Sequence, residues 1–287
     1  MNLFSELAIE QLEAAQISHG QGRGVPGVSC RRKRICGVDV QTMTVETDAA
    51  ANILCKPRGN YSTISLGKVL RRQDDAFEDT VFCISSVIGS MLPKDAESVL
   101  LVCLGNGSIT PDALGPSCAK QLMVTRHLKK QHPDLFEAFR STALISPGVL
   151  GTTGMESAAL VKGAVEAAEP DCVIAIDALA AADVKRLATT VQICDTGLDP
   201  GAGVGNNRCG LHRDTLGVPV IGIGVPTVVD ARAFAKEEAR QGRGEGLFVT
   251  PRDIDSIITH SAKLLGYGIN LALHRDLTIG DIELFLG

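Results

Sequence analysis

Aromatic residues are scarce in this chain of 287 residues: they make up 3% of it, and tryptophan is absent. Surfaces that bind single-stranded nucleic acids stack the bases on aromatic side chains, and a net charge of −5 provides no overall attraction to polyanions. No apolar run in the sequence approaches the roughly 18 residues that a membrane-spanning helix needs. We therefore expect neither direct nucleic-acid binding nor contact with a membrane.

Several short catalytic and metal-binding motifs are missing as well. The nine cysteines are irregularly spaced without a CxxC pair, and neither HExxH nor GxSxG occurs, so we expect no zinc site, no resident cofactor and no nucleophilic serine or cysteine. Cys103, Cys172 and Cys194 lie inside apolar runs, where reduced thiols pack like small hydrophobic groups. Because the amino terminus also lacks a signal-peptide pattern, we expect a reducing, cytoplasmic compartment.

From Ser98 onward, short apolar runs alternate with helical stretches. This alternation predicts βαβ units and therefore an α/β fold with a mostly parallel sheet. We place this α/β core at residues 96–287 and an N-terminal segment, packed on the core, at residues 7–95. In that segment the basic run at residues 31–34 is interpreted as a solvated turn, with a patch that binds anions as the alternative. The strands expected in the core are 99–104, 143–145, 173–176, 191–193 and 218–223.

Two aspartates each follow a predicted buried strand. Asp112 lies shortly after the run that ends at Leu104, and Asp177 directly follows the run that ends at Ile176. Because parallel strands bring their carboxyl ends to one edge of a sheet, we expect the two carboxyl groups to meet. Such a pair shares a proton and activates water for peptide hydrolysis. The residues alone leave two alternatives: a divalent metal held by the same pair, or structural roles as a helix cap and a turn residue.

Loops rich in small residues follow other predicted strands and offer backbone N–H groups to a substrate or an oxyanion. A flexible connection explains the loop at residues 146–154 equally well. The stretch Val225–Asp230 is expected to begin a helix, with Thr227 or Asp230 as its cap. The candidate substrate or oxyanion contacts are Gly148, Gly151, Gly154, Gly203, Asn206 and Thr227.

Several motifs together, in this order and spacing, resemble the spore germination protease family of endospore-forming bacteria. The resemblance covers residues 98–275, and the N-terminal part more loosely. The motifs are NGSITPDALGP (Asn106–Pro116), VTRHL (Val124–Leu128), VIAIDALAA (Val173–Ala181), GVGN (Gly203–Asn206), VPVIGIGVPTVVDA (Val218–Ala231) and LFVTPRDID (Leu247–Asp255).

The resemblance implies a homotetrameric endopeptidase that degrades small acid-soluble spore proteins in the spore core during germination. It also implies a three-layer sandwich similar to the core of the hydrogenase maturation proteases. Asp112 and Asp177 match the family's essential aspartates. Since the corresponding acids of the maturation proteases bind nickel in their substrate, a metal-dependent protease stays an alternative. A catalytically silent homologue that binds spore proteins is another.

The resemblance further implies a zymogen that removes a short N-terminal piece by self-cleavage. The family cuts after an acidic residue that is followed by an apolar residue and then alanine. Glu6, Leu7 and Ala8 fit this order. We therefore expect residues 1–6 to form a short propeptide, with the cut between Glu6 and Leu7.

Overall fold

The computed structural model describes residues 5–18, 24–70, 76–200, 209–234, 247–274 and 276–286. The α-helices are α1 Ala8–Ser18, α2 Asp48–Leu54, α3 Gly67–Leu70, α4 Ala76–Met91, α5 Leu114–Ala119, α6 Arg126–Gln131, α7 Leu150–Thr153, α8 Ser157–Ala168, α9 Arg213–Leu216, α10 Ile254–Leu273 and α11 Ile279–Leu286. The strands are β1 Val28–Ile35, β2 Val38–Val45, β3 Gly59–Ser65, β4 Ser98–Cys103, β5 Ser141–Ile145, β6 Cys172–Ala181, β7 Thr190–Cys194, β8 Val220–Asp230 and β9 Phe248–Val249. Short 3-10 helices are η1 Thr110–Asp112, η2 Val184–Arg186 and η4 Ala231–Phe234.

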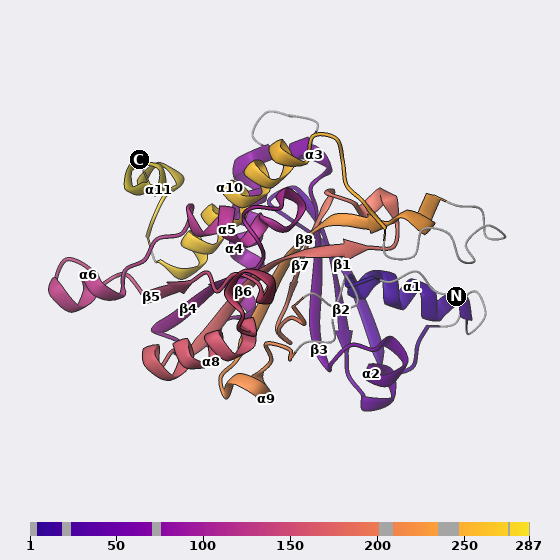
Figure 1. Ribbon diagram of the computed structural model, residues 1–287, viewed down its shortest axis with the longest axis horizontal. Helices are drawn as coiled ribbons and strands as arrows, with labels where there is room; N and C mark the ends of the chain where they lie inside the picture. Colours follow the sequence, from indigo (N-terminus) through magenta and orange to yellow (C-terminus); the bar gives the residue numbers. More distant parts are fainter. Residues whose placement is uncertain are drawn as a thin grey trace.

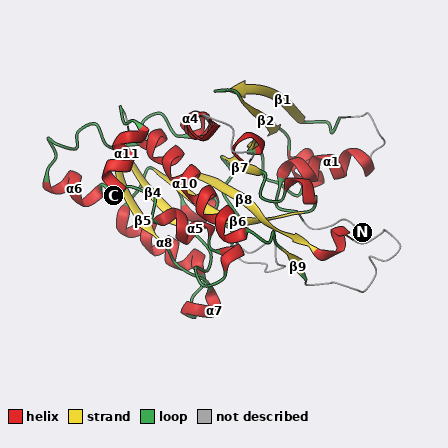
Figure 2. Cartoon of the chain, turned by 90° about the horizontal axis from the view of Figure 1, so that it is seen from above, coloured by secondary structure: helices red, strands yellow, loops and turns green. Residues whose placement is uncertain are grey.

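The described strands form one sheet in the order β1-β2-β3-β7-β8-β6-β4-β5, and β9 pairs with β8 (Figure 2). The strands β8, β6, β4 and β5 pair in parallel. The other pairs are antiparallel. The strands β1 to β3 therefore extend the sheet of the α/β core, while the division of the chain at residue 95 stays a prediction.

Helices cover both faces of this sheet (Figure 1). On one face, α4, α5 and α10 pack over Ile174 and Ile176 of β6. On the other, α1, α2 and α8 pack over the alternate residues Val173 and Ala175. Burial on both faces explains why β6 is continuously apolar in sequence instead of alternating. The predicted α/β sandwich is confirmed.

The basic run at residues 31–34 is not a solvated turn, as the sequence had suggested, but part of the strand β1. This strand forms a hairpin with β2, and the turn between them, Cys36-Gly37, has φ angles of +47° and +71°. Two such residues in succession form the tight turn that suits a β-hairpin. Because β1 lies at the edge of the sheet, its exposed cationic side chains oppose pairing with another strand.

One predicted helix also differs from the structure. The stretch Val225–Asp230 continues β8 instead of beginning a helix, because β6 and β9 supply backbone partners to it from elsewhere in the chain. Between β4 and β5 the chain forms two short helices, α5 and α6. Among the described helices, none is long and apolar enough to cross a membrane.

The core cysteines are buried free thiols, as expected from their apolar surroundings. Burial raises the pKa of Cys103 and of Cys172 to about 12. A thiol is a nucleophile only as the thiolate, so these side chains are inert packing groups at neutral pH.

Candidate functional site

Asp112 lies in η1, just after the strand β4. The chain leaves β4 through Gly105, whose φ of +108° disfavours other residues. A Cβ on Gly105 would lie 2.1 Å from the main-chain oxygen of Asp112, so the loop folds back closely on itself. The N–H of Asn106 donates to Asp112 Oδ2 at 2.9 Å and to the Asp112 main-chain oxygen at 3.0 Å. The loop thereby sets the orientation of this carboxyl group.

Asp177 lies inside β6 and not at its end, which corrects the expectation from sequence. The strand continues to Ala181 because it pairs with β8, with an irregularity between Leu179 and Ala180. The side chain is buried, and its Oδ1 accepts a hydrogen bond from the N–H of Ala178 at 2.8 Å. Its neighbour across the sheet is Gly224, which carries no side chain.

The two aspartates line one cleft of about 660 Å³. The loop after β4 supplies one carboxyl group and β6 supplies the other, while β8, the loop after β5 and the N-terminal segment complete the walls. The polar residues of the lining include Glu6, Asn106, Asp112, Thr152, Asp177 and Thr227. Both acids therefore line one cavity, while their joint role in catalysis stays a prediction.

The other candidate residues divide into three groups. Gly148, Gly151 and Thr227 line the cleft, whereas Gly154, which ends α7 with a φ of +71°, lies outside the described lining. Residues 203 and 206 lie outside the described part of the chain. Their contacts with a substrate or an oxyanion stay predictions.

Thr227 has an unusual environment for a buried hydroxyl group. It is 1% exposed, and its Oγ1 has no hydrogen-bond partner among the described residues. Buried hydroxyl groups are normally hydrogen-bonded. The hydroxyl group of Thr227 is therefore an unsatisfied polar group in the wall of the cleft.

The residues proposed for self-cleavage lie at this cleft. Glu6 is part of the lining, and its neighbour Leu7 is fully buried in the cluster that α1 covers. The main-chain N–H of Glu6 donates to the oxygen of Ala180 at 3.0 Å, close along β6 to Asp177. The N-terminal segment therefore reaches the site of the two aspartates.

The described residues contain no group of three or more His, Cys, Asp or Glu side chains arranged to hold a metal ion. Asp112 and Asp177 would offer hard oxygen ligands, which suit ions such as Mg²⁺. A metal held there would depend on water or substrate for its remaining ligands.

Sequence reasoning did not single out Gln192. It lies in β7 between Val191 and Ile193, and its side chain is 3% exposed. Its carboxamide contacts the N-terminal segment on both sides of Leu7. The available signal was a polar residue inside an otherwise apolar strand, since buried amides are rare unless hydrogen-bonded.

Comparisons with known proteins agree with the sequence motifs. Residues 5–241 match the family described as Germination protease. The germination protease of Caldanaerobacter subterraneus subsp. tengcongensis is 38% identical, covering 100% of this chain and 98% of that protein. That of Clostridium acetobutylicum is 36% identical, covering 98% of each.

A solved structure, a [NiFe] hydrogenase maturation protease HycI from Thermococcus kodakarensis KOD1, is also similar. It matches 64% of this chain and 98% of its own chain, at 17% identity and a TM-score of 0.35. At that TM-score it adds nothing to the fold described above.

Proposed function

Since this chain belongs to the germination protease family and is a peptidase of spore germination, we propose that Asp112 and Asp177 together activate the water that cleaves the peptide bond. The single observation that carries the proposal is that both carboxyl groups line one cleft. One carboxylate accepts a proton from the water, and the protonated partner donates to the carbonyl oxygen and then to the leaving nitrogen.

The surroundings of the two carboxyl groups support these proposed roles in proton transfer. The loop at Gly105 and the N–H of Asn106 orient Asp112, and the N–H of Ala178 orients Asp177. Carboxyl groups held in this way need no rearrangement before the reaction. Backbone donors of the loop near Gly148 and the hydroxyl group of Thr227 stand in the same cleft to bind the peptide.

The substrates we propose are small acid-soluble spore proteins, and the proposed place of action is the spore core. We also propose a homotetramer. The names of the relatives support a protease of spore germination. Analytical ultracentrifugation of the purified chain tests the assembly, and a monomer at micromolar concentration would contradict it.

Substitution of each aspartate tests the mechanism. Asp112→Asn and Asp177→Asn remove a proton-transfer group while preserving shape, so each should slow cleavage of a purified spore protein by roughly 100- to 10,000-fold. Asp134→Asn, at an exposed position away from the cleft, is the matched control. Full activity in either of the first two variants would refute the aspartate pair.

Chelation separates the two mechanisms that the acids allow. With water alone between the carboxyl groups, activity should persist after dialysis against a strong chelator. Loss of activity that returns on addition of a divalent ion would favour the metal-dependent route. Spore-protein binding without any turnover that depends on Asp112 would instead identify a silent homologue.

The N-terminal segment is the first substrate that we propose. Glu6 lines the cleft together with both aspartates, which supports a cut at the bond between Glu6 and Leu7. Self-cleavage there would release residues 1–6 as a propeptide. Intact-mass measurement of the chain after incubation at mildly acidic pH checks both the event and the cut position.

A further inference from the structure

Glu6 is held in place by hydrogen bonds to both its backbone and its side chain. Its N–H donates to the oxygen of Ala180 at 3.0 Å. Its Oε2 accepts from the N–H of Ala180 at 2.7 Å, and its main-chain oxygen accepts from Nε2 of Gln192 at 3.3 Å. A side chain of another length or without an acceptor would not satisfy the Ala180 N–H, so this arrangement fits glutamate.

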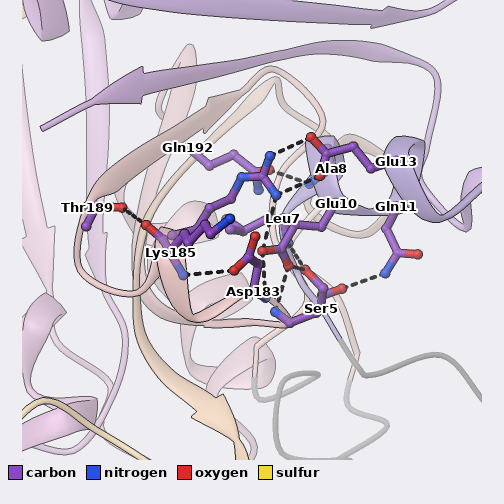
Figure 3. A network of polar contacts seen from close by, with 12 residues as sticks. Ser5, Leu7, Ala8, Glu10, Gln11, Glu13, Asp183, Lys185, Thr189 and Gln192 are labelled. Carbon is purple, nitrogen blue, oxygen red and sulfur yellow. Dashed lines mark hydrogen bonds and ion pairs between the residues drawn. The ribbon is translucent and has the colours of Figure 1, made fainter. Parts of the chain in front are cut away.

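Gln192 contacts the segment on both sides of one residue, Leu7. Its Nε2 donates to the oxygen of Glu6, and its Oε1 accepts from the N–H of Ala8 at 2.7 Å. Figure 3 shows the second of these bonds, with Gln192 and Ala8 joined across the segment. Since the carboxamide is buried, no bulk water competes for these bonds. The carbonyl group of the Glu6–Leu7 bond is therefore held by a side chain.

Gln192 also stands in the same row of the sheet as Asp177. Gln192 of β7 is in register with Gly224 of β8, and Gly224 is in register with Asp177 of β6. Residues in one row point to the same face of a sheet. Two strand spacings separate the Cα atoms by about 10 Å. Both side chains therefore point to the same face of the sheet, and the side chain of Leu179 packs over the glycine between them.

The chain beyond Leu7 is fixed by a second set of contacts. Leu7 and Ala8 are fully buried. The carboxylate of Glu10 accepts from the N–H groups of Ala182 and Asp183 at 2.7 and 3.0 Å, and it also pairs with Ser5 (Figure 3). The residues on the carboxyl side of the bond are thus anchored to the end of β6 independently of Gln192.

We propose that the main chain of Ala180 and the carboxamide of Gln192 form the subsite that presents the Glu6–Leu7 bond to the two aspartates, and that Gln192 is a positioning residue for its carbonyl group. This rests on the self-cleavage proposed above. In the reaction, the water oxygen forms a bond to the Glu6 carbonyl carbon, the C–N bond to Leu7 breaks, and the two protons of water end on the new carboxyl group and the released amine. Gln192 donates to the carbonyl oxygen, which gains negative charge on the way.

The test measures release of residues 1–6 from the full-length chain by intact-mass spectrometry. Gln192→Ala removes the donor and should slow self-cleavage by about 100-fold, as expected for loss of a donor to an oxyanion. Glu6→Gln exchanges a charged acceptor for a neutral one at the Ala180 N–H and should slow it roughly tenfold. Gln131→Ala, at the exposed end of α6, is the control with an unchanged rate.

A pH profile distinguishes positioning from mere support of the fold. In Gln192→Glu the acceptor for Ala8 remains, and a donor to Glu6 returns only when the new carboxyl group is protonated. The ratio of its rate to that of the parent chain should therefore rise as pH falls toward about 4. A variant that only loosens the fold would show a lower melting temperature and a constant ratio.

The remaining outcomes separate this inference from the proposed function. Cleavage of an added spore protein, abolished in Asp112→Asn, together with no release of residues 1–6 would overturn the inference and leave the function intact. Equal self-cleavage in Gln192→Ala and Gln131→Ala would do the same. Absence of both cleavages in a folded parent chain would refute the function itself, and the inference with it.

Discussion

Replacement of His274 should make the protein more resistant to acid. The imidazole follows α10, is 2% exposed and has no hydrogen-bond partner for either ring nitrogen among the described residues. Burial, and then the nearby charges of Arg140 and Lys129, lower the pKa of His274 to about 4. The ring packs at 5.2 Å from that of Phe139, so the fold uses the imidazole as an apolar group.

The size of the effect follows from the lowered pKa. Below pH 6.5 the unfolded chain binds a proton at His274, whereas the folded chain stays neutral until about pH 4. The free energy of unfolding therefore falls as pH drops through this window. Above pH 6.5, His274 is neutral in both states and does not change the free energy of unfolding. With 1.36 kcal/mol for each pH unit, the loss between pH 6.5 and pH 4.5 is about 2.7 kcal/mol.

Urea unfolding at pH 7.5 and at pH 4.5 measures this effect. In His274→Leu the stability lost between the two pH values should be about 2–3 kcal/mol smaller than in the parent chain. His127→Leu, which replaces an exposed histidine of α6, is the matched control. If His274→Leu and the parent lost the same stability within about 0.5 kcal/mol, the burial argument would be refuted.

Three other positions yield sharp expectations. Gly105→Ala should lower stability by about 1–3 kcal/mol and strongly reduce cleavage, since the residue has a φ of +108° and its Cβ would collide with Asp112; urea unfolding and a peptidase assay check both. Thr227→Val should raise stability by about 1 kcal/mol by removing an unsatisfied hydroxyl group while raising KM, measured in the same assays. Hydrogen bonding to Asp199 raises the pKa of His212. The protonated histidine therefore stabilises the fold below pH 6.5, and this stabilisation is lost as pH rises through the raised pKa. His212→Gln should accordingly cost more stability at pH 6 than at pH 9.

The local elements of the core could be predicted because each depends on neighbouring residues. The run Val99–Leu104 corresponds to β4, and Val173–Ile176 lies within β6. What failed depended on pairing with other strands: β2, which follows β1 after a two-residue turn, and the more distant β6 and β9. Residues 31–34 became a strand because β2 pairs with them, and Val225–Asp230 stayed extended because β6 and β9 flank it. Backbone hydrogen bonds between strands are non-local, so local patterns do not reveal them.

The candidate site divides in the same way. The motifs around Asp112 and Asp177 singled out the two acids, because a lone carboxyl group beside a buried strand is visible along the chain. Gln192 was not singled out, because its contacts are with residues far away in the sequence. It lies 184 residues after Ala8, to which it is hydrogen-bonded.

The sequence by itself indicated the α/β class and the buried thiols, and its resemblance to the family singled out the two aspartates and the acidic residue before Leu7. These follow from residue type and short-range order. Only the tertiary structure decided that Asp177 lies inside β6, that Leu179 packs over Gly224 beside it, and that Ala180 and Gln192 form hydrogen bonds with Glu6. The physical reason is that strand register and the path of the N-terminal segment are set by packing across the whole sheet.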